Sequence, residues 1–220
     1  MHRATPLPDE LAGRPFRVDE ALALGVTRKR LDSADLWAPF RGVRVPVALG
    51  WDSVLRGRAG LLVCPPGTIL AGLHAVAAAG LRVPVGLPPL DLQPLLVSPP
   101  FSTRGWSRQG FAVDTALLPR RVPLTSSDGA LRPSDADLWA RTVAWPWLPL
   151  TPFRRRAYSA GLAIDVADRI GPGTAGALSS AFWRLPPGLR PRAQPLLELV
   201  LQDLAADDVG GPSDSGSGRG

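Results

Sequence analysis

The fold is decided by residues 16–46, which read FRVDEALALGVTRKRLDSADLWAPFRGVRVP. Within it, apolar residues recur at helical spacing over residues 18–24. Gly25 follows as a residue that ends a helix, because it takes a positive φ without strain from a Cβ atom. Thr27 predicts the N-cap of a second helix that begins at Arg28, since its hydroxyl accepts a hydrogen bond from a free first-turn N–H. The sequence therefore predicts two helices joined by a tight turn.

The second predicted helix opens with a run of cations. Arg28, Lys29 and Arg30 occupy its first turn, and Ser33 lies one turn further on. In helix-turn-helix motifs the N-terminal residues of the second helix face the base edges, and a planar guanidinium group contacts guanine O6 and N7 in bidentate fashion. The alternative is a solvated helix face, although cations at a helix start oppose the helix dipole. We predict that these residues and Thr27 contact DNA.

A short hairpin is predicted to follow the helix pair. Residues 40–45 alternate enough to form a small strand, on which Arg41 and Arg44 are placed to contact phosphates. Ala34 and Trp37 are expected to face inward against the first helix. The order of helix, glycine turn, basic helix and arginine-bearing hairpin is that of a winged helix-turn-helix, which places a helix in the DNA major groove.

The chain as a whole is predicted to be α+β, with two domains and a tail. The winged helix-turn-helix domain takes residues 1–50, and a mixed α/β domain with a helical C-terminal part takes residues 51–206. Residues 207–220 are rich in Gly and Ser and predict a disordered tail. Residues 102–108 are polar, which predicts a hairpin or an exposed loop, and Trp106 within them is the tryptophan expected to be exposed.

Local patterns predict a series of elements in the second domain. In chain order they are helices at 51–59 and 69–79 (the latter capped by Thr68 and stopped by Gly80), a loop at 83–89, and strands at 90–97, 111–118 and 121–125. Further helices are predicted at 134–143 (capped by Ser134), from Thr151, as its cap, through Arg156, at 163–170, at 174–183 and at 195–205.

Two segments resemble the antitoxin family of type IV, abortive-infection toxin–antitoxin systems. The stronger match is Phe16-x-Val18-x-x-Ala21-x-x-x-Gly25-Val26-Thr27-x-x-x-Leu31 followed by Phe40-Arg41-Gly42-Val43-x-Val45-Pro46, and the weaker one covers residues 66–71 and 78–81. The resemblance implies a cytoplasmic, sequence-specific DNA-binding repressor of its own promoter, whose remaining domain neutralises a cognate nucleotidyltransferase-like toxin. Many relatives carry an endonuclease-like C-terminal domain instead.

Composition excludes several kinds of chemistry. Lys29 is the only lysine, which removes a phosphate-binding loop and the acidic-x-Lys core of restriction-type nucleases. Cys64 is the only cysteine and His2 and His74 are the only histidines, so no disulfide and no zinc cluster is expected. We expect His74 to be a partly buried, hydrogen-bonded structural residue and Cys64 to be a buried apolar one. The chain is therefore predicted to be no enzyme and to need no cofactor or metal.

Charge is compatible with two kinds of partner. The net charge of +6 and the isoelectric point of about 11 suit double-stranded DNA, but a GC-rich coding sequence would also give this excess of arginine. Arg154, Arg155 and Arg156 form a second basic run, which is a candidate surface for a protein partner or a solvated helix face. The alternatives to a repressor are therefore an interaction module without specific DNA binding and an inactive endonuclease remnant.

No membrane partner is expected. The N-terminus lacks the continuous apolar core of a signal peptide, and residues 69–81, the longest apolar run, are too short to span a bilayer, which needs about 20 residues. The sequence predicts a cytoplasmic protein.

Overall fold

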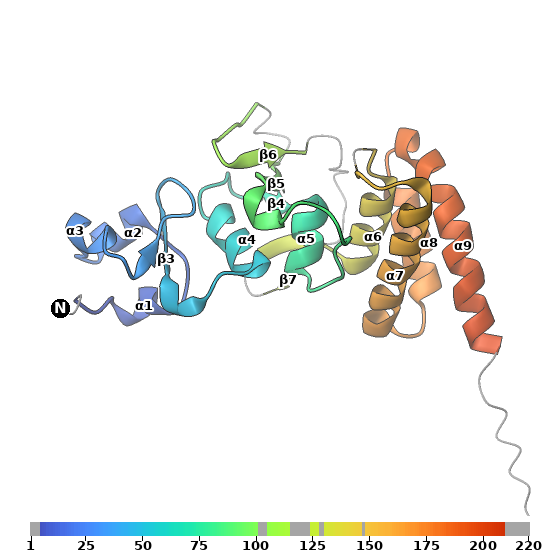
Figure 1. Cartoon of the computed structure of the whole chain (residues 1–220), viewed down its shortest axis with the longest axis horizontal. Coiled ribbons are helices and arrows are strands. Elements are labelled where there is room, and N and C mark those ends of the chain that lie inside the picture. The colour runs from blue at the N-terminus through green and yellow to red at the C-terminus, as the bar shows by residue number, and fades with distance from the viewer. Residues whose placement is uncertain (1–4, 101–104, 115–123, 128–129, 147, 210–220) are drawn as a thin grey trace, which may run out of the picture.

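The computed structural model describes residues 5–100, 105–114, 124–127, 130–146 and 148–209 (Figure 1). The chain is a mixed α and β protein with small sheets, as predicted. Figure 1 shows an elongated molecule with the N-terminal elements at one end and the last three helices at the other. Two helices and several short strands lie between these ends.

The N-terminal elements form a small α and β unit around a three-stranded antiparallel sheet of order β1-β3-β2. Phe16 of β1 pairs with Arg44, and Leu36 of β2 pairs with Pro46. The elements are α1 (Asp9–Ala12), β1 (Phe16–Arg17), α2 (Val18–Ala23), α3 (Arg28–Leu31), β2 (Leu36–Trp37) and β3 (Val43–Pro46), followed by a 3₁₀ turn at Val47–Leu49.

Two separate apolar cores hold the molecule together. The smaller core lies within the N-terminal unit and consists of Leu11, Phe16, Ala21, Val26, Leu31 and Leu36. The larger core runs through the rest of the chain, and Phe40, Val43 and Val45 belong to it. The hairpin of β2 and β3 therefore joins the N-terminal unit to the body, and Phe40, expected on a strand, lies instead in the connection between β2 and β3 and packs on Phe111 at a ring distance of 4.8 Å.

The central part combines two helices with short strands. Its elements are α4 (Ser53–Leu61), β4 (Ile69–Leu70), α5 (Gly72–Ala78), a 3₁₀ turn at Leu90–Leu92, β5 (Leu95–Ser98), β6 (Phe111–Val113), β7 (Leu124–Ser127) and β8 (Ala130–Pro133). Asp52 caps α4 by accepting a hydrogen bond from the Leu55 N–H at 2.6 Å. Gly57 and Gly60 allow α4 to lie close to β4 and β5, because a Cβ atom at either position would overlap a leucine of those strands. The helix predicted at 51–59 is thus confirmed with a small shift.

The structure corrects one prediction for this central part and excludes one of the two alternatives of another. Residues 69 and 70 are not helical, because they pair with Ser98 and Val97 of β5, and Thr68 donates to the Pro65 carbonyl at 2.7 Å instead of capping a helix. β5 and β6 are parallel, which excludes a hairpin between them. Both differences arise from pairing of β5 with strands distant in sequence, which local sequence patterns do not predict.

Several smaller differences concern the strands. The strand predicted at 90–97 begins with a 3₁₀ turn, β6 ends at Val113, and β7 begins at Leu124. Residues 115–123, on which the predicted strands at 111–118 and 121–125 partly fall, lie outside the described residues. Trp106, predicted to be exposed, is half-buried against Phe111 with a ring distance of 5.4 Å.

The C-terminal part is helical and is organised around α6 (Asp135–Ala144). Ser134 caps α6 as predicted, since its hydroxyl accepts a hydrogen bond from the Asp137 N–H at 3.3 Å. Residues 136–144 of α6 are all buried, because α5 lies on one side of it and α7 (Pro152–Ile170), α8 (Thr174–Arg184) and α9 (Arg190–Val209) surround the rest. Trp139 at its centre donates its indole N–H to the Ser159 carbonyl at 3.0 Å.

Three helix boundaries in this part differ from the prediction. The two helices predicted between residues 151 and 170 are one 19-residue helix, α7, in which Gly161 lies against the side chain of Arg82. α9 begins at Arg190 and keeps Pro195 inside it, while its buried Leu196 and Val200 hold the helix against the core. α9 also ends at Val209, so the predicted tail begins later, and residues 210–220 lie outside the described residues.

Candidate nucleic-acid interface

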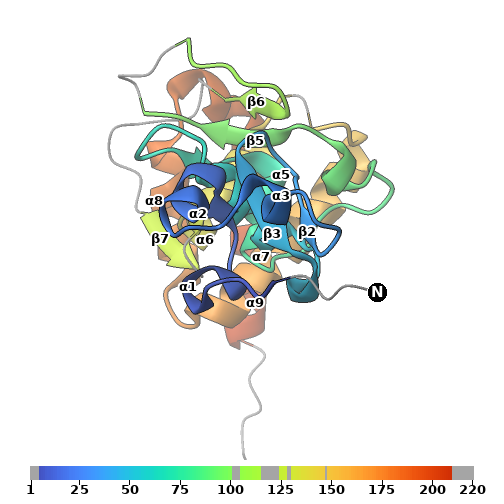
Figure 2. The ribbon, with the colours of Figure 1, turned by 90° about the vertical axis from the view of Figure 1, so that its left-hand side faces the viewer.

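The start of α3 is fixed by two local signals that the sequence predicts correctly. Gly25 has a φ of 82°, and the Thr27 hydroxyl accepts a hydrogen bond from the Arg30 N–H at 3.2 Å. Figure 2 views the molecule from the N-terminal end, with α2 and α3 toward the viewer. α3 has only four residues, so Ser33, expected one turn along the helix, lies in the turn that follows it.

Arg30 is held inside the N-terminal unit. Its guanidinium group forms a bidentate ion pair with Asp35, with N–O distances of 2.9 and 2.8 Å, and also donates to the Ser33 hydroxyl and to the Thr5 carbonyl. Only 10% of the side chain is exposed. The Ser33 hydroxyl donates a hydrogen bond to the Asp35 carboxylate and is the main cause that holds the pKa of Asp35 below its ordinary value. The hydrogen bonds from Arg30 lower this pKa further. Arg30 and Ser33 therefore fix the turn after α3.

Arg44 also makes contacts within the unit. Its Nε donates to the Leu31 carbonyl at 2.7 Å, one Nη donates to the Val43 carbonyl, and the other Nη forms an ion pair with the Asp32 carboxylate at 3.0 Å. These bonds satisfy a carbonyl at the end of α3, which the short helix leaves without an internal partner. Arg44 therefore ties β3 to the end of α3, with 18% of its side chain exposed.

Three cations of the unit remain open to solvent. Arg28 and Lys29 on α3 are exposed, as is Arg41 in the connection between β2 and β3. No hydrogen bond or ion pair of these three side chains occurs within the described ranges. Of the seven predicted contact residues, these are the ones whose charged groups are available to a ligand without breaking an existing contact.

The carboxylates beside the basic run are the residues that the sequence analysis overlooked. Asp32 and Asp35 follow the run within five residues and pair with Arg44 and Arg30. Two further arginines are paired in the same way, Arg14 with Glu20 and Arg17 with Asp19. The sequence signal that could have revealed these ion pairs is an acidic residue near an arginine, as Asp35 is near Arg30, because oppositely charged side chains within one small unit can pair.

The expected inward orientation of Ala34 and Trp37 is wrong. Both are exposed, and the indole ring of Trp37 packs edge-on against Trp51, with a centroid distance of 5.8 Å and an interplanar angle of 77°. The short α3 explains the error, because the chain has left the helix before it reaches these positions. Leu31, still on α3, is buried as expected.

The second basic run is only partly accessible. Arg155 donates to the carbonyls of Val143, Trp145 and Leu148 at 3.3, 2.9 and 2.8 Å, and Arg154 donates to the Val85 carbonyl. Arg156 is exposed and makes no hydrogen bond or ion pair with any described residue. Arg155 therefore holds the C-terminal end of α6, and Arg156 is the one residue of the run whose guanidinium group makes no hydrogen bond or ion pair with a described residue.

The remaining reactive side chains have structural surroundings. Burial lowers the pKa of His74 to about 4, and its ring nitrogens contact Arg56 at 2.9 Å and the Leu96 N–H at 3.3 Å. Burial also raises the pKa of the Cys64 thiol to about 12, which disfavours the thiolate that a nucleophile needs. The structural interpretation of His74 is confirmed, whereas Cys64 is half-buried instead of fully buried.

Among the described residues, no group of three or more His, Cys, Asp and Glu side chains is arranged to hold a metal ion. In the same part of the chain, no helix combines the length and the apolar character needed to cross a bilayer. Comparison of the chain with protein-family models, with curated proteins and with solved structures found no match.

Proposed function

We propose that this chain is a sequence-specific DNA-binding protein of the winged helix-turn-helix type that represses its own promoter. The order of the N-terminal elements, α1-β1-α2-α3-β2-β3, and the sheet order β1-β3-β2 support this proposal. So do the position of α3 at the far end of the molecule and the net charge of +6. The protein acts in the cytoplasm, where DNA is accessible, and not as an enzyme.

One observation carries the proposal more than any other. Four arginines of the N-terminal unit are each paired with a carboxylate, whereas Arg28, Lys29 and Arg41 are exposed and make no such pair with a described residue. Their placement without a compensating carboxylate is typical of a surface that awaits an anion.

The contact residues then divide by role. Arg28 and Lys29 reach the major groove, where Arg28 contacts a base edge or a phosphate, and Arg41 contacts the backbone beside it. Thr27, Arg30, Ser33 and Arg44 hold α3 and the turn after it in place through the hydrogen bonds described above. Four of the seven predicted contact residues are therefore positioning residues.

The test is a pair of double variants that remove equal charge. Arg28→Ala with Lys29→Ala is expected to weaken binding to DNA from upstream of the chain's own gene about 100-fold, because an arginine–base contact is worth about 1–3 kcal/mol and a lysine–phosphate contact adds to it. Arg156→Ala with Arg192→Ala removes two exposed cations from α7 and α9 and is expected to leave binding within about twofold. Fluorescence anisotropy measures both.

Equal loss of affinity in the two double variants would contradict the proposed site, since binding would then depend on net charge alone. Thermal melts of both variants serve as the control for folding. Neither pair makes hydrogen bonds within the described chain, so both melts are expected to match the unmodified protein.

We also retain, as a second part of the proposal, the neutralisation of a nucleotidyltransferase-like toxin that the resemblance implies. An exposed apolar strip on α7 favours it: Phe153 is 81% exposed and Ile164, three turns further along the same face, is 54% exposed. The test is coexpression with a nucleotidyltransferase-like protein encoded beside this chain's gene. The chain should restore growth, and Phe153→Asp with Ile164→Asp should remove that rescue while the thermal melt stays unchanged. Failure of the unmodified chain to rescue growth would contradict this part.

A further inference from the structure

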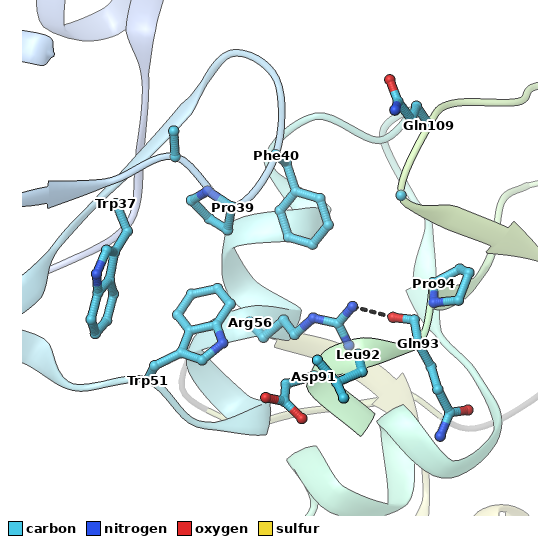
Figure 3. A pocket seen from close by; sticks show the side chains of 12 residues that line it. Trp37, Pro39, Phe40, Trp51, Arg56, Asp91, Leu92, Gln93, Pro94 and Gln109 are labelled. Carbon is cyan, nitrogen blue, oxygen red and sulfur yellow. Dashed lines mark hydrogen bonds between the residues drawn. The ribbon is translucent and has the colours of Figure 1, made fainter. Parts of the chain in front are cut away.

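A cavity of about 710 Å³ opens between the N-terminal unit and the central part of the molecule (Figure 3). The N-terminal side supplies Trp37 and Phe40, and the central part supplies Trp51, Arg56 and Asp91. The volume lies within the range of pockets that hold small molecules, which occur preferentially where two units of a protein meet. Neither its aromatic side chains nor its charged ones are used by the proposed DNA contacts.

Aromatic rings form one wall of this cavity. Figure 3 shows Trp51 and Phe40 on one side, with Pro39 between them, and Leu92 and Pro94 across from them. Trp37 supports Trp51 edge-on at 5.8 Å, and Phe111 supports Phe40 at 4.8 Å. A wall of supported rings offers flat apolar faces, which suit a planar ring that stacks in offset or edge-to-face geometry.

The guanidinium group of Arg56 is already occupied by the protein. One Nη donates to the Leu90 carbonyl and lies 2.9 Å from the His74 ring, and the other Nη donates to the Gln93 carbonyl. Only 7% of the residue is exposed. Arg56 therefore fixes the 3₁₀ turn of residues 90–92 beneath the cavity and offers little charge to a ligand.

Asp91, unlike Arg56, has its charged group available to a ligand. Its carboxylate is exposed at the edge of the cavity and, within the described ranges, accepts no hydrogen bond and forms no ion pair. The nearby Arg56 interacts with it electrostatically, but the donors of that guanidinium group point to backbone carbonyls. The charge that the cavity presents to a ligand is therefore negative, and it lies beside electron-rich ring faces that also attract cations.

We propose that this cavity is a binding site for a small ligand that carries a planar aromatic ring and a protonated amine. The ring stacks against Trp51, beside the largely buried Phe40, and the ammonium group pairs with the Asp91 carboxylate at the edge of the cavity. The proposal stands independently of DNA binding.

The test compares two probes that share an aromatic ring and carry charged groups of opposite sign. Phenethylamine and 3-phenylpropionate share a phenyl ring on a two-carbon chain, and isothermal titration calorimetry measures both against the full chain at neutral pH. Phenethylamine is expected to bind at least about tenfold more tightly, which corresponds to about 1.4 kcal/mol of ion-pair and cation–π attraction. Trp51→Ala is expected to weaken binding of both probes.

Variants of Asp91 decide the outcome, because this exposed side chain makes no hydrogen bond or ion pair with a described residue and interacts with Arg56 only through its charge, and a thermal melt of each variant checks the fold. Asp91→Asn should bring the two affinities together, and Asp91→Lys should invert the preference, whereas the control Asp203→Asn on α9 should leave it unchanged. The proposal is overturned if the unmodified chain prefers 3-phenylpropionate, if the preference for phenethylamine survives in Asp91→Asn, or if no phenethylamine binding is detected at about 10 mM.

Discussion

The two ends of the molecule are both rich in arginine but use it differently. At the C-terminal end Arg155, Arg169 and Arg190 each donate to carbonyls at the end of a neighbouring helix, α6, α5 and α8 respectively. At the N-terminal end Arg28 and Arg41 extend into solvent without such an acceptor among the described residues. The first group stabilises helix ends, where carbonyls lack internal partners.

The difference shows that net charge is a poor guide to a binding surface in a chain of this composition. A charge of +6 says nothing about which cations are available, because an arginine that already binds carbonyls or carboxylates must break those bonds to reach a ligand. The arrangement of acceptors around each arginine makes that distinction. Variants at paired arginines should therefore change stability, and variants at unpaired ones should change binding.

The largest effect is expected at the C-terminal end, from Asp137→Asn. Asp137 is 1% exposed and pairs with Arg184 through two bonds of 2.9 Å. Removal of the carboxylate charge leaves the 30% exposed Arg184 without this partner and weakens the compensation of the buried Arg141, which together cost about 3 kcal/mol. Urea unfolding measures the loss, with the exposed Asp203→Asn on α9 as the control. Unfolding midpoints that agree for the two variants would contradict the structural role of this pair.

A smaller loss, about 2 kcal/mol, is expected from Arg155→Met, because the substitution keeps the apolar stem but removes the donors to the carbonyls of Val143 and Trp145 at the end of α6 and of Leu148 in the segment after it. The neighbouring Arg156→Met is a matched control that should shift the free energy of unfolding by less than about 0.5 kcal/mol. The comparison between paired and unpaired arginines fails if chemical denaturation finds the two variants equally stable.

At the N-terminal end, Arg30→Ala should cost about 1 kcal/mol, a modest value because half of the Asp35 side chain is exposed to solvent. The folded state lowers the pKa of Asp35 below its ordinary value of 3.8. The stabilisation is therefore complete above that pH and disappears as the pH falls through the lowered pKa. The gap between the unmodified chain and Arg30→Ala should therefore begin to narrow as the pH falls below about 4 and should keep narrowing down to about pH 2. A gap that stays constant over this range would exclude the ion pair as its cause.

The smallest effect is expected from Thr27→Ala. Loss of the N-cap hydroxyl leaves the Arg30 N–H without its acceptor and costs about 0.5–1 kcal/mol. Thr27→Ser keeps the hydroxyl and should behave like the unmodified chain in a thermal melt. If both variants melt alike, the cap does not stabilise α3, and the assignment of Thr27 as a positioning residue loses its support.

The sequence predicted best those elements whose signals are local. Gly25, Thr27, Ser134 and Thr151 mark helix boundaries through their own backbone and hydroxyl groups, and the structure confirms each of them. No neighbouring segment was needed to interpret these positions. The same signals failed to give the length of α3, because the turn after Leu31 is held by Arg30 and Arg44 through contacts with distant residues.

Predictions that depend on distant partners were less successful. Ile69 looked like the first residue of an apolar helix, yet it pairs with Ser98 in β5. Two helices were predicted between residues 151 and 170, yet α7 is continuous there, and Gly161 within it leaves room for the side chain of Arg82. The sequence also did not show that Arg28 is open to solvent while Arg30 is paired, because both belong to one basic run. Only the fold brings the Asp35 carboxylate to Arg30 and not to Arg28.

The most direct test of the account is an anisotropy titration of the purified chain against its own upstream DNA and a scrambled duplex of equal length, at two salt concentrations. The account predicts tight binding of the upstream duplex alone, with the logarithm of the affinity falling by about 0.9 per phosphate contact for each unit in the logarithm of salt concentration. Equally weak binding of both duplexes would contradict it, because the exposed cations of α3 would then act as nothing more than part of a basic surface.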